Sequence, residues 1–345
     1  MSTEVTTPIA VRADAPAVLA PPDAGPGLRW RPLVVEDAPL LTRLVQAVEE
    51  ADGMPYRTTE AEVRAELEAS WRDLSRDTVL GLDADGAPQA WMQVQTSPGD
   101  ERVVRVFVHG GVLPPWRGRG VGRDLVRWGT GRARQLLAES GKDLPGRICL
   151  YVDDRTPDVA RLYTAAGYRP LRYYAEMRRR VTGDGVTLPA APDVPGVRVV
   201  PWTPERDEEL RVTHNEVFAD HWGSEPRTPE QWAAGHAQHA PGWSFLALDE
   251  ADAVVGYVVS CRYEEDWAVA GFTSGYTHLL GVRRAWRGRG LAVALLAHAL
   301  QAYARDGMEY AEIGVDTANP SGAHGLYASL GYEVSDSSAL YGIEM

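Results

Sequence analysis

Cysteine is scarce in this chain. Its 345 residues include only Cys149 and Cys261. Two cysteines so far apart exclude a disulfide scaffold and a zinc site built on cysteine ligands. Both lie in apolar, strand-like runs, which favours buried thiols in a reducing compartment. We therefore expect a cytoplasmic protein with no metal site.

Excess positive charge and long apolar runs are also lacking. The 35 basic and 48 acidic residues give a formal net charge of −13, the opposite of what phosphate-contacting nucleic-acid binders need. No apolar run reaches the roughly 18 residues of a membrane span. The N-terminus has no basic patch ahead of an apolar core, so no signal peptide is expected. Nucleic acids and membranes are thereby excluded as expected partners.

Two segments of low periodicity divide the chain. Residues 1–27 are rich in Ala, Pro and Asp and predict a disordered tail. Residues 182–196 contain Pro189, Pro192 and Pro195 and predict a semi-rigid linker. The remaining segments, 28–181 and 197–345, are each of domain size.

The two predicted domains are repeats of each other. Trp-Arg-Gly-Arg-Gly begins at Trp116 and again at Trp286, an offset of 170. Leu-Tyr-x-x-x-Gly-Tyr begins at Leu162 and again at Leu326, an offset of 164. The first copy is therefore six residues longer between its motifs, which suggests a surface-loop insertion around 141–145.

Strand and helix patterns alternate in the same order in both repeats. Mixed elements of this kind indicate an α/β class, with an α+β mixed sheet in each domain. The expected helices are 35–51, 122–140, 203–218 and 291–306, and a short helix carries each Leu-Tyr pair. The expected strands are 78–82, 90–94, 103–112, 147–152, 244–248, 254–261, 276–282 and 310–315.

Each repeat runs from a strand through Arg-Gly-Arg-Gly into a long helix. Unpartnered N–H groups and the helix dipole attract phosphate at such a terminus, glycine leaves room for it, and arginine adds charge-assisted hydrogen bonds. Triphosphate and dinucleotide loops have other spacings. A solvated turn or an RGG-like RNA segment is the alternative. The duplication favours two diphosphate cradles, formed by Arg117, Gly118, Arg119, Gly120, Val121 and Gly122 and by Arg287, Gly288, Arg289, Gly290, Leu291 and Ala292.

The combined pattern resembles the GCN5-related N-acetyltransferase (GNAT) superfamily. The shared features are Arg-x-x-Gly-x-Gly/Ala after a strand, a distal asparagine at Asn319, and the Leu-Tyr motif. The tandem arrangement and the run from Asn215 to His221 resemble the mycothiol synthase branch. The resemblance implies two splayed mixed sheets flanked by helices, with acetyl-CoA between the parting strands.

The resemblance also implies residue roles. Backbone groups of Leu280, Gly281 and Val282, and of Val112 in the first repeat, would pair with the pantetheine arm. Asn319 would hydrogen-bond near that arm, and Tyr327 would protonate the departing thiolate. Packing alone is the other interpretation of Tyr327.

The repeats differ at one of these positions. The first repeat keeps Tyr163 but has Arg155 where the second has Asn319. We therefore expect catalysis in the C-terminal domain and a structural or CoA-holding N-terminal domain.

The general base is not determined by the pattern. The mycothiol synthase resemblance implies a glutamate where this chain has Tyr276. His278 is a candidate base or an ordinary strand histidine, and residues 264–266 form an acidic turn. Tyr276, His221 and Glu60 are expected on the acceptor side.

These residues predict an acetyl-CoA-dependent N-acetyltransferase. It would act on the primary amine of a small molecule by direct attack, as a monomer or homodimer. Mycothiol synthase proper and a non-catalytic acyl-CoA sensor are the alternatives.

Overall fold

The computed structural model describes residues 7–22, 27–96, 99–235, 238–318 and 322–345. Its contacts divide the chain into unit 1, Met1–Arg172 with Ser338–Met345, and unit 2, Tyr173–Ser337. The predicted boundaries at 181 and 197 do not coincide with these units. The reason is that the last strand of each repeat pairs within the other unit.

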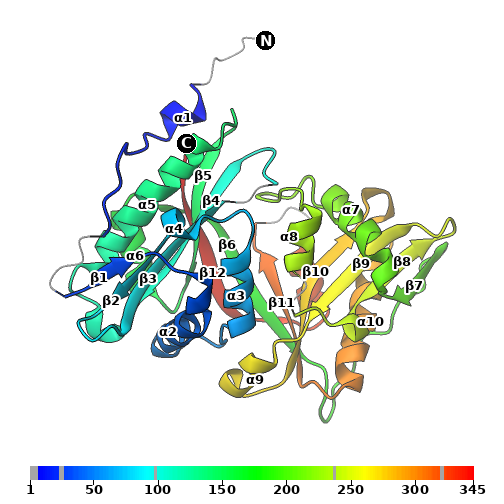
Figure 1. Cartoon of the computed structure of the whole chain (residues 1–345). Coiled ribbons are helices and arrows are strands. Elements are labelled where there is room, and N and C mark those ends of the chain that lie inside the picture. The colour runs from blue at the N-terminus through cyan, green and yellow to red at the C-terminus, as the bar shows by residue number, and fades with distance from the viewer. Residues whose placement is uncertain (1–6, 23–26, 97–98, 236–237, 319–321) are drawn as a thin grey trace. The chain divides into compact units, whose positions relative to one another are not determined.

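Unit 1 is built on a mixed sheet of strand order β1-β2-β3-β4-β5-β12 (Figure 1). Helix α5 packs against one face, and α2 and α3 cover the other. The elements are α1 (Ile9–Arg12), β1 (Arg29–Arg31), η1 (Val35–Asp37), α2 (Ala38–Ala51), α3 (Glu60–Glu68), α4 (Leu74–Asp77), β2 (Thr78–Leu82), β3 (Pro88–Thr96), β4 (Val104–Val112), η2 (Pro114–Trp116), α5 (Val121–Glu139), β5 (Gly146–Asp153), α6 (Pro157–Ala165) and the later part of β12 (Glu333–Glu344).

Unit 2 repeats the plan with the strand order β6-β11-β10-β9-β8-β7. Helix α10 covers one face of its sheet, and α7 and α8 pack on the other. The elements are β6 (Arg169–Arg180), β7 (Val197–Pro201), η3 (Pro204–Arg206), α7 (Asp207–Val217), α8 (Pro229–Ala234), η4 (Pro241–Trp243), β8 (Phe245–Asp249), β9 (Val254–Cys261), α9 (Glu264–Ala270), β10 (Ser274–Val282), η5 (Arg284–Trp286), α10 (Leu291–Arg305), β11 (Tyr310–Asp316) and α11 (Ala323–Ser329).

The final strands of the two repeats are exchanged. In unit 1, Ser338–Glu344 of β12 pair antiparallel with β5, from Ser338 opposite Asp153 to Glu344 opposite Arg147 (Figure 1). In unit 2, β6 pairs antiparallel with β11, from Tyr174 opposite Asp316 to Arg180 opposite Tyr310. Each repeat therefore supplies one strand to the unit that holds most of the other repeat.

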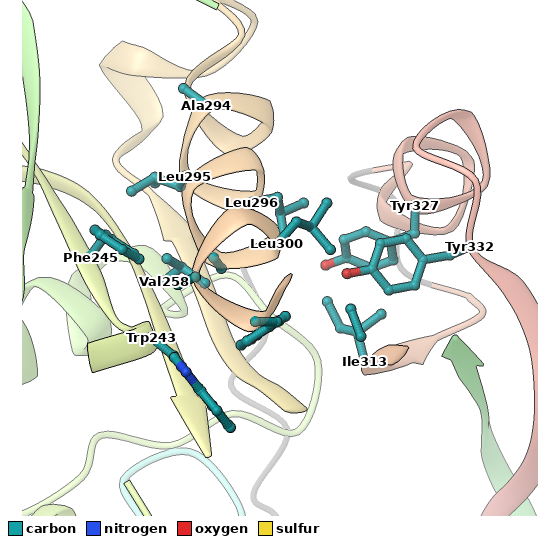
Figure 2. Packing of buried hydrophobic residues seen from close by; sticks show 14 of the residues in the cluster. Trp243, Phe245, Val258, Ala294, Leu295, Leu296, Leu300, Ile313, Tyr327 and Tyr332 are labelled. Carbon is teal, nitrogen blue, oxygen red and sulfur yellow. The ribbon is translucent and has the colours of Figure 1, made fainter. Parts of the chain in front are cut away.

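Helix α10 forms because Leu and Ala, which are strong helix formers, make up most of its sequence. It ends at Arg305, and Gly307, whose φ is +77°, then turns the chain out of the helical direction. Leu295, Leu296 and Leu300 of this helix are fully buried (Figure 2). Across the described ranges, no helix combines the length and apolar character needed to span a bilayer.

The predicted tail is wrong for residues 7–22. Ile9 is 2% exposed and belongs to the same buried cluster as Leu137 of α5. Leu19 packs over Gly131 of α5, where a Cβ would lie 2.8 Å from its methyl group. A few apolar side chains seated over glycines therefore anchor a segment whose composition indicates disorder. Residues 1–6 and 23–26 lie outside the described part.

The six extra residues of the first repeat are not confined to a loop. Helix α5 has 19 residues against 15 in α10, so most of the insertion lengthens the helix. Only the extra residues that are not in α5 lengthen the connection around 141–145, where the sequence predicted the whole insertion.

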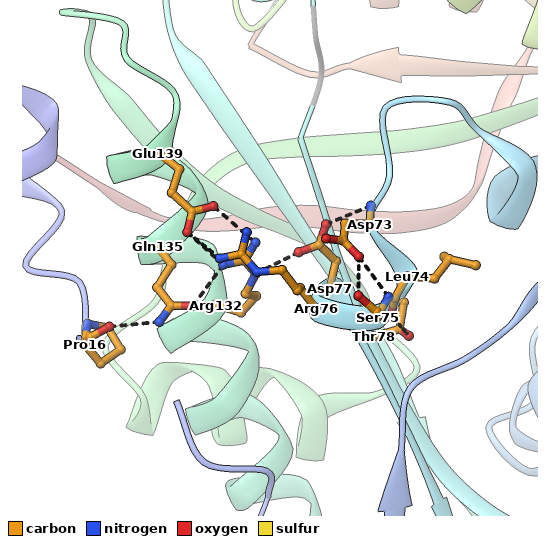
Figure 3. A network of polar contacts seen from close by, with 10 residues as sticks. All are labelled: Pro16, Asp73, Leu74, Ser75, Arg76, Asp77, Thr78, Arg132, Gln135 and Glu139. Atoms are coloured by element: carbon orange, nitrogen blue, oxygen red, sulfur yellow. Dashed lines mark hydrogen bonds and ion pairs between the residues drawn. The ribbon is translucent and has the colours of Figure 1, made fainter. Parts of the chain in front are cut away.

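A buried ion network holds α5 to the segment before β2 (Figure 3). The Arg132 side chain is 3% exposed, and its Nε donates to Asp77 Oδ1 at 2.7 Å. Its Nη1 donates to Gln135 at 2.9 Å and to Glu139 at 3.3 Å. Arg76 reaches the same Glu139 carboxylate from the surface at 2.7 Å.

Candidate active site

Strands β10 and β11 of unit 2 part in the middle of the sheet. Their parallel pairing runs from Ser274 opposite Tyr310 to Thr277 opposite Ile313 and ends there. β10 continues to Val282 along β9, and β11 continues to Asp316 along β6. Beyond Thr277, the edge of β10 that faced β11 therefore presents backbone groups to a gap. The splayed sheet implied by the resemblance is confirmed.

A β-bulge lies where the strands part. The register of β10 on β9 shifts between Thr277 and Leu279, so His278 is the extra residue. In unit 1, β4 pairs one-to-one with β3 from Val106 to Val112. Simple alternation would put His278 on the face of Tyr276, and the bulge interrupts that alternation. Only the second repeat has this irregularity in the strand before its glycine turn.

Position 281 has room only for glycine, because an aromatic ring lies directly beside its backbone. A Cβ at this position would overlap the aromatic ring of Tyr257 on β9. Its neighbours Leu280 and Val282 pack against the α10 core instead. In the first repeat, Gly111 lies next to Val112 and meets the Trp91 ring in the same way. An aromatic ring thus packs flat against the end of each central strand.

The turn into α10 depends on Gly288 and Gly290, whose φ values are +75° and +82°. A Cβ at Gly288 would meet nothing within 4 Å, so backbone conformation, not space, requires the glycine there. Arg287 donates from Nε to the Val282 carbonyl at 3.0 Å and from Nη2 to the Val217 carbonyl at 3.2 Å. Arg287 therefore fixes the turn, and Arg289 stacks over Trp286 at 4.8 Å.

The first repeat has the same turn with different charges. Gly118 and Gly120 have φ values of +72° and +92°, and Arg119 lies 5.1 Å from the Trp116 ring. Arg117 donates to the Val112 carbonyl at 2.8 Å, but it also forms an ion pair of 2.5 Å with Asp52. At the start of α5, Val121 is buried, and a Cβ on Gly122 would lie 3.2 Å from Leu162.

The first turn of α10 carries no acidic side chain. Gly290 occupies the N-cap position, and the Ala294 N–H makes the first i→i−4 bond back to it at 3.0 Å. The N–H groups of Leu291 and Ala292 come earlier, so they have no partner within the helix. The first turn of α5 carries Asp124, whereas that of α10 carries no acidic residue. The α10 terminus is thus the more favourable of the two for an anion.

Tyr327 of α11 is 6% exposed and lies beside Leu296 and Leu300 of α10 (Figure 2). Its ring centroid is 6.0 Å from that of Tyr332. Burial raises the pKa of Tyr327 to about 12, so the phenol keeps its proton at neutral pH. Tyr163 is equally buried, edge-on to Tyr168 at 5.1 Å, and burial raises its pKa as well. Asn319 lies outside the described residues.

Tyr276 has a partner that the sequence did not indicate. Its hydroxyl donates to the Glu176 carboxylate, at 3.2 Å to Oε2 and 3.5 Å to Oε1. Burial and the nearby Glu176 carboxylate raise the pKa of Tyr276 well above its ordinary value. The only local signal for Glu176 is its place between Ala175 and Met177, both buried. A carboxylate is therefore present next to the position where the resemblance implies one.

An aromatic and histidine cluster lies between α7 and β9–β10. His214 is 3% exposed. Its Nδ1 forms a hydrogen bond of 2.8 Å with the Tyr257 hydroxyl, and its ring stacks on that of Phe218 with 4.6 Å between the ring centroids. Burial is the main cause that lowers the pKa of His214 to about 3. His278 and His221 lower it further through their charges, which places both nearby. His221 follows the end of α7, and its Nδ1 lies 3.1 Å from the Trp222 carbonyl.

His214 makes unfolding sensitive to acid. Between pH 6.5 and about 3 the unfolded chain binds a proton that the folded chain excludes, so the free energy of unfolding falls as the pH falls below 6.5. At pH 5 we expect a loss of about 2 kcal/mol from this residue. Denaturant unfolding of wild type and His214→Gln at pH 5 and pH 8 measures it. Equal pH slopes in the two proteins would show that His214 is not the cause.

The structure also describes Glu60 and the expected acidic turn at 264–266. Glu60 is the first residue of α3 in unit 1, where its side chain is 48% exposed and pairs with Arg64 at 2.8 Å. Glu264, Glu265 and Asp266 form the first turn of helix α9. Glu264 pairs with Arg262 at 2.6 Å.

Comparisons with known proteins agree with this geometry. A sequence model described as "Acetyltransferase (GNAT) family" matches residues 207–332. A mycothiol acetyltransferase from Thermobispora bispora is 29% identical over 306 residues, covering 86% of this chain and 92% of the relative. The crystal structure of a GCN5-related N-acetyltransferase from Sphaerobacter thermophilus is 29% identical, with a TM-score of 0.67 over 94% of this chain and 97% of that one. A tandem GNAT protein from the clavulanic acid biosynthesis pathway shares the fold at 18% identity and a TM-score of 0.65, covering 92% and 98%.

Proposed function

Because this chain is an N-acetyltransferase of the GNAT superfamily in tandem form, we propose that unit 2 transfers the acetyl group of acetyl-CoA to a primary amine of a small molecule. The observation that carries the proposal is the parting of β10 from β11 after Thr277. After the parting, β10 runs on to Val282, and the glycine turn and the N-terminus of α10 follow it. A thioester arm and a diphosphate need these two features side by side.

The residues of unit 2 suit the parts of acetyl-CoA, which supplies the activated acetyl group. Backbone groups of Leu280, Gly281 and Val282 would hydrogen-bond the pantetheine arm like an added strand. The N–H groups of Leu291 and Ala292 would hold the diphosphate. Arg289 would add a charge-assisted contact. Asn319 would hydrogen-bond near the pantetheine arm, as the resemblance implies.

Tyr327 serves as the proton donor to the leaving sulfur in this proposal. A phenol whose pKa is about 12 is fully protonated at neutral pH and donates to a developing thiolate. Tyr327 lies on α11, in the Leu-Tyr motif on which the resemblance to the family rests. His278 at the bulge and His221 beyond α7 line the acceptor side together with Tyr276.

Unit 1 supports a structural or CoA-holding role. Arg155, at the position that corresponds to Asn319, pairs with Asp153 at 3.2 Å. The Phe107 and Tyr151 rings stack at 6.4 Å beside β5. The register of β4 on β3 has no bulge from Val106 to Val112, and Asp52 offsets the charge of Arg117, so unit 1 differs from unit 2 in both features.

The matched arginines test which unit binds the cofactor. Arg289→Ala should weaken acetyl-CoA binding by about 1.5–3 kcal/mol, the contribution of a charge-assisted hydrogen bond. Arg119→Ala makes the same change in the first repeat and should leave the unit 2 site intact. Calorimetric titration of both variants gives the answer. A loss of binding in Arg119→Ala alone would transfer the proposed site to unit 1.

The relatives favour a second candidate, mycothiol synthase proper, whose acceptor is a cysteinyl-glucosaminyl-inositol. The Thermobispora bispora relative is matched over 92% of its length, which supports this candidate. The mycothiol synthase candidate is disfavoured because this chain has Tyr276 where that resemblance implies a glutamate. A panel of amines with detection of released thiol separates the two, and binding without any thiol release would indicate an acyl-CoA sensor.

A further inference from the structure

The exchanged strand β6 brings a carboxylate to the acceptor side of unit 2. Ala175 and Met177 of β6 are buried in the α10 core, so Glu176 between them lies on the opposite face of the sheet. That face also carries Tyr276 of β10. Glu176 therefore belongs to the first repeat in sequence and to the candidate active site in space.

Gly314 is what allows these two side chains to meet. β11 lies between β10 and β6, and Gly314 is directly opposite Glu176. A Cβ on Gly314 would lie 2.9 Å from Glu176 Oε1 and 2.9 Å from the Tyr276 hydroxyl oxygen. Gly314 has no positive φ that would require glycine. Its missing side chain leaves room for the Tyr276–Glu176 hydrogen bond to cross above the strand.

The pair lies at the mouth of the gap in the sheet. Tyr276 is the residue before Thr277, where the pairing of β10 with β11 ends. An acetyl thioester held along the following residues of β10 would place its carbonyl beside this pair. An amine that attacks the carbonyl from the acceptor face would approach over Tyr276 and Glu176.

We propose that Glu176 binds the ammonium group of the acceptor and takes its proton, while Tyr276 positions the carboxylate. The inference rests on the proposed function, and it specifies the acceptor as a cationic primary amine. Glu176 accepts one proton from the ammonium, which frees the nitrogen lone pair. The lone pair forms the bond to the thioester carbonyl carbon, the C–S bond breaks, and Tyr327 protonates the sulfur. The second nitrogen proton returns to Tyr327 through water, and Glu176 releases its proton to solvent.

Charged groups of both signs lie on the face of the sheet that carries Glu176. Glu312 lies on β11, and burial raises its pKa. The Arg178 guanidinium of β6 lies 5.0 Å from the centre of the Phe272 ring and 5.2 Å from that of the Tyr310 ring. Other titratable groups here are Arg180 of β6, which lies 5.0 Å from the Tyr310 ring, Tyr263, whose ring is 5.7 Å from that of Tyr276, Asp336, which interacts electrostatically with Glu312, and His278 at the bulge.

Glu176→Gln tests the proton transfer. Glutamine keeps the size of the side chain and an acceptor for the Tyr276 hydroxyl. With the best substrate from a panel of glucosamine, cadaverine, lysine and taurine, we expect kcat at pH 7 to fall about 10²-fold. The kcat of the variant should then rise with pH up to the pKa of the amine itself, because only free amine reacts. Wild type should reach its plateau at lower pH.

Three further variants separate this role from a structural one. Glu312→Gln makes the same change on the adjacent strand and should keep the wild-type pH profile. Glu176→Asp keeps a carboxylate and should keep the acidic limb at lower kcat. Tyr276→Phe should shift the pH profile and raise KM for the amine. A Glu312→Gln variant whose kcat reaches its plateau only at the higher pH expected for Glu176→Gln would contradict the assignment to Glu176.

The outcomes distinguish this inference from the function on which it rests. If wild type binds acetyl-CoA but releases no thiol with any amine, both the proposed acetyltransferase function and the role of Glu176 are contradicted. If wild type turns over while Glu176→Gln keeps full kcat and the wild-type pH profile, only the role of Glu176 is overturned. If taurine, whose sulfonate leaves it with no net charge at pH 7, is a better acceptor than cadaverine, the preference for a cationic acceptor is overturned. Calorimetry should show unchanged acetyl-CoA affinity in Glu176→Gln.

Discussion

Replacing Tyr327 with phenylalanine is expected to lower kcat by about 10²–10⁴-fold, the usual contribution of a general acid. The ring remains, so its packing beside Tyr332 and α10 is preserved. Only the proton for the leaving sulfur is lost. Because that proton is needed as the C–S bond breaks, kcat and kcat/KM should fall together. Steady-state thiol release measures both constants.

The matched control is Tyr163→Phe, which removes the corresponding hydroxyl from unit 1 and should leave turnover nearly unchanged. A more acidic thiol as leaving group should rescue Tyr327→Phe, because it departs without a proton. Full kcat in a folded Tyr327→Phe protein would mean that this tyrosine only packs. Loss of turnover in Tyr163→Phe alone would move the active site to unit 1.

Removing Asp77 should cause the largest loss of stability. Arg132 is 3% exposed, and without the bond from its Nε to Asp77 it becomes a buried, partly compensated charge (Figure 3). Removing one partner of a buried pair typically costs about 3–5 kcal/mol. We expect Asp77→Ala to lie at the lower end, because Gln135 and Glu139 still contact the guanidinium. Denaturant unfolding gives the value.

Two variants bracket this result. Arg76→Ala removes an ion pair whose side chains are 54% and 43% exposed, and exposed pairs contribute about 0–1 kcal/mol. Asp77→Ala combined with Arg132→Met removes both charges, so it should recover much of the lost stability. If Asp77→Ala unfolds at the same denaturant concentration as Arg76→Ala, the buried network does not stabilise unit 1.

Much of the fold was predictable from local patterns. The runs 78–82 and 254–261 were expected as strands and coincide with β2 and β9. The helix expected at 291–306 is α10 to within one residue. These elements carry continuous apolar runs or a clear helical period, which are properties of a few neighbouring residues. The repeat motifs also located both glycine turns correctly.

What could not be predicted depends on pairing between distant residues. Nothing in the sequence of β6 indicates that it pairs with β11 of the second repeat. Glu176 therefore could not be related to Tyr276, which lies 100 residues away. Similarly, the bulge at His278 and the burial of Ile9 follow from the strands and helices that pack around them. Arg287 has the residue type of a phosphate ligand, but its hydrogen bonds go to two backbone carbonyls.

The exchange of final strands has a consequence for how the chain is made. On the ribosome, β5 is synthesised long before its partner β12, since Arg147 and its ion-pair partner Glu344 are 197 residues apart. At typical rates of translation the interval is roughly 10–40 s. Throughout it, one edge of β5 has unpaired backbone groups, the kind of edge that promotes aggregation. The unit that is translated first is thus the unit that is completed last, when Met345 closes its pair of backbone bonds with Gly146.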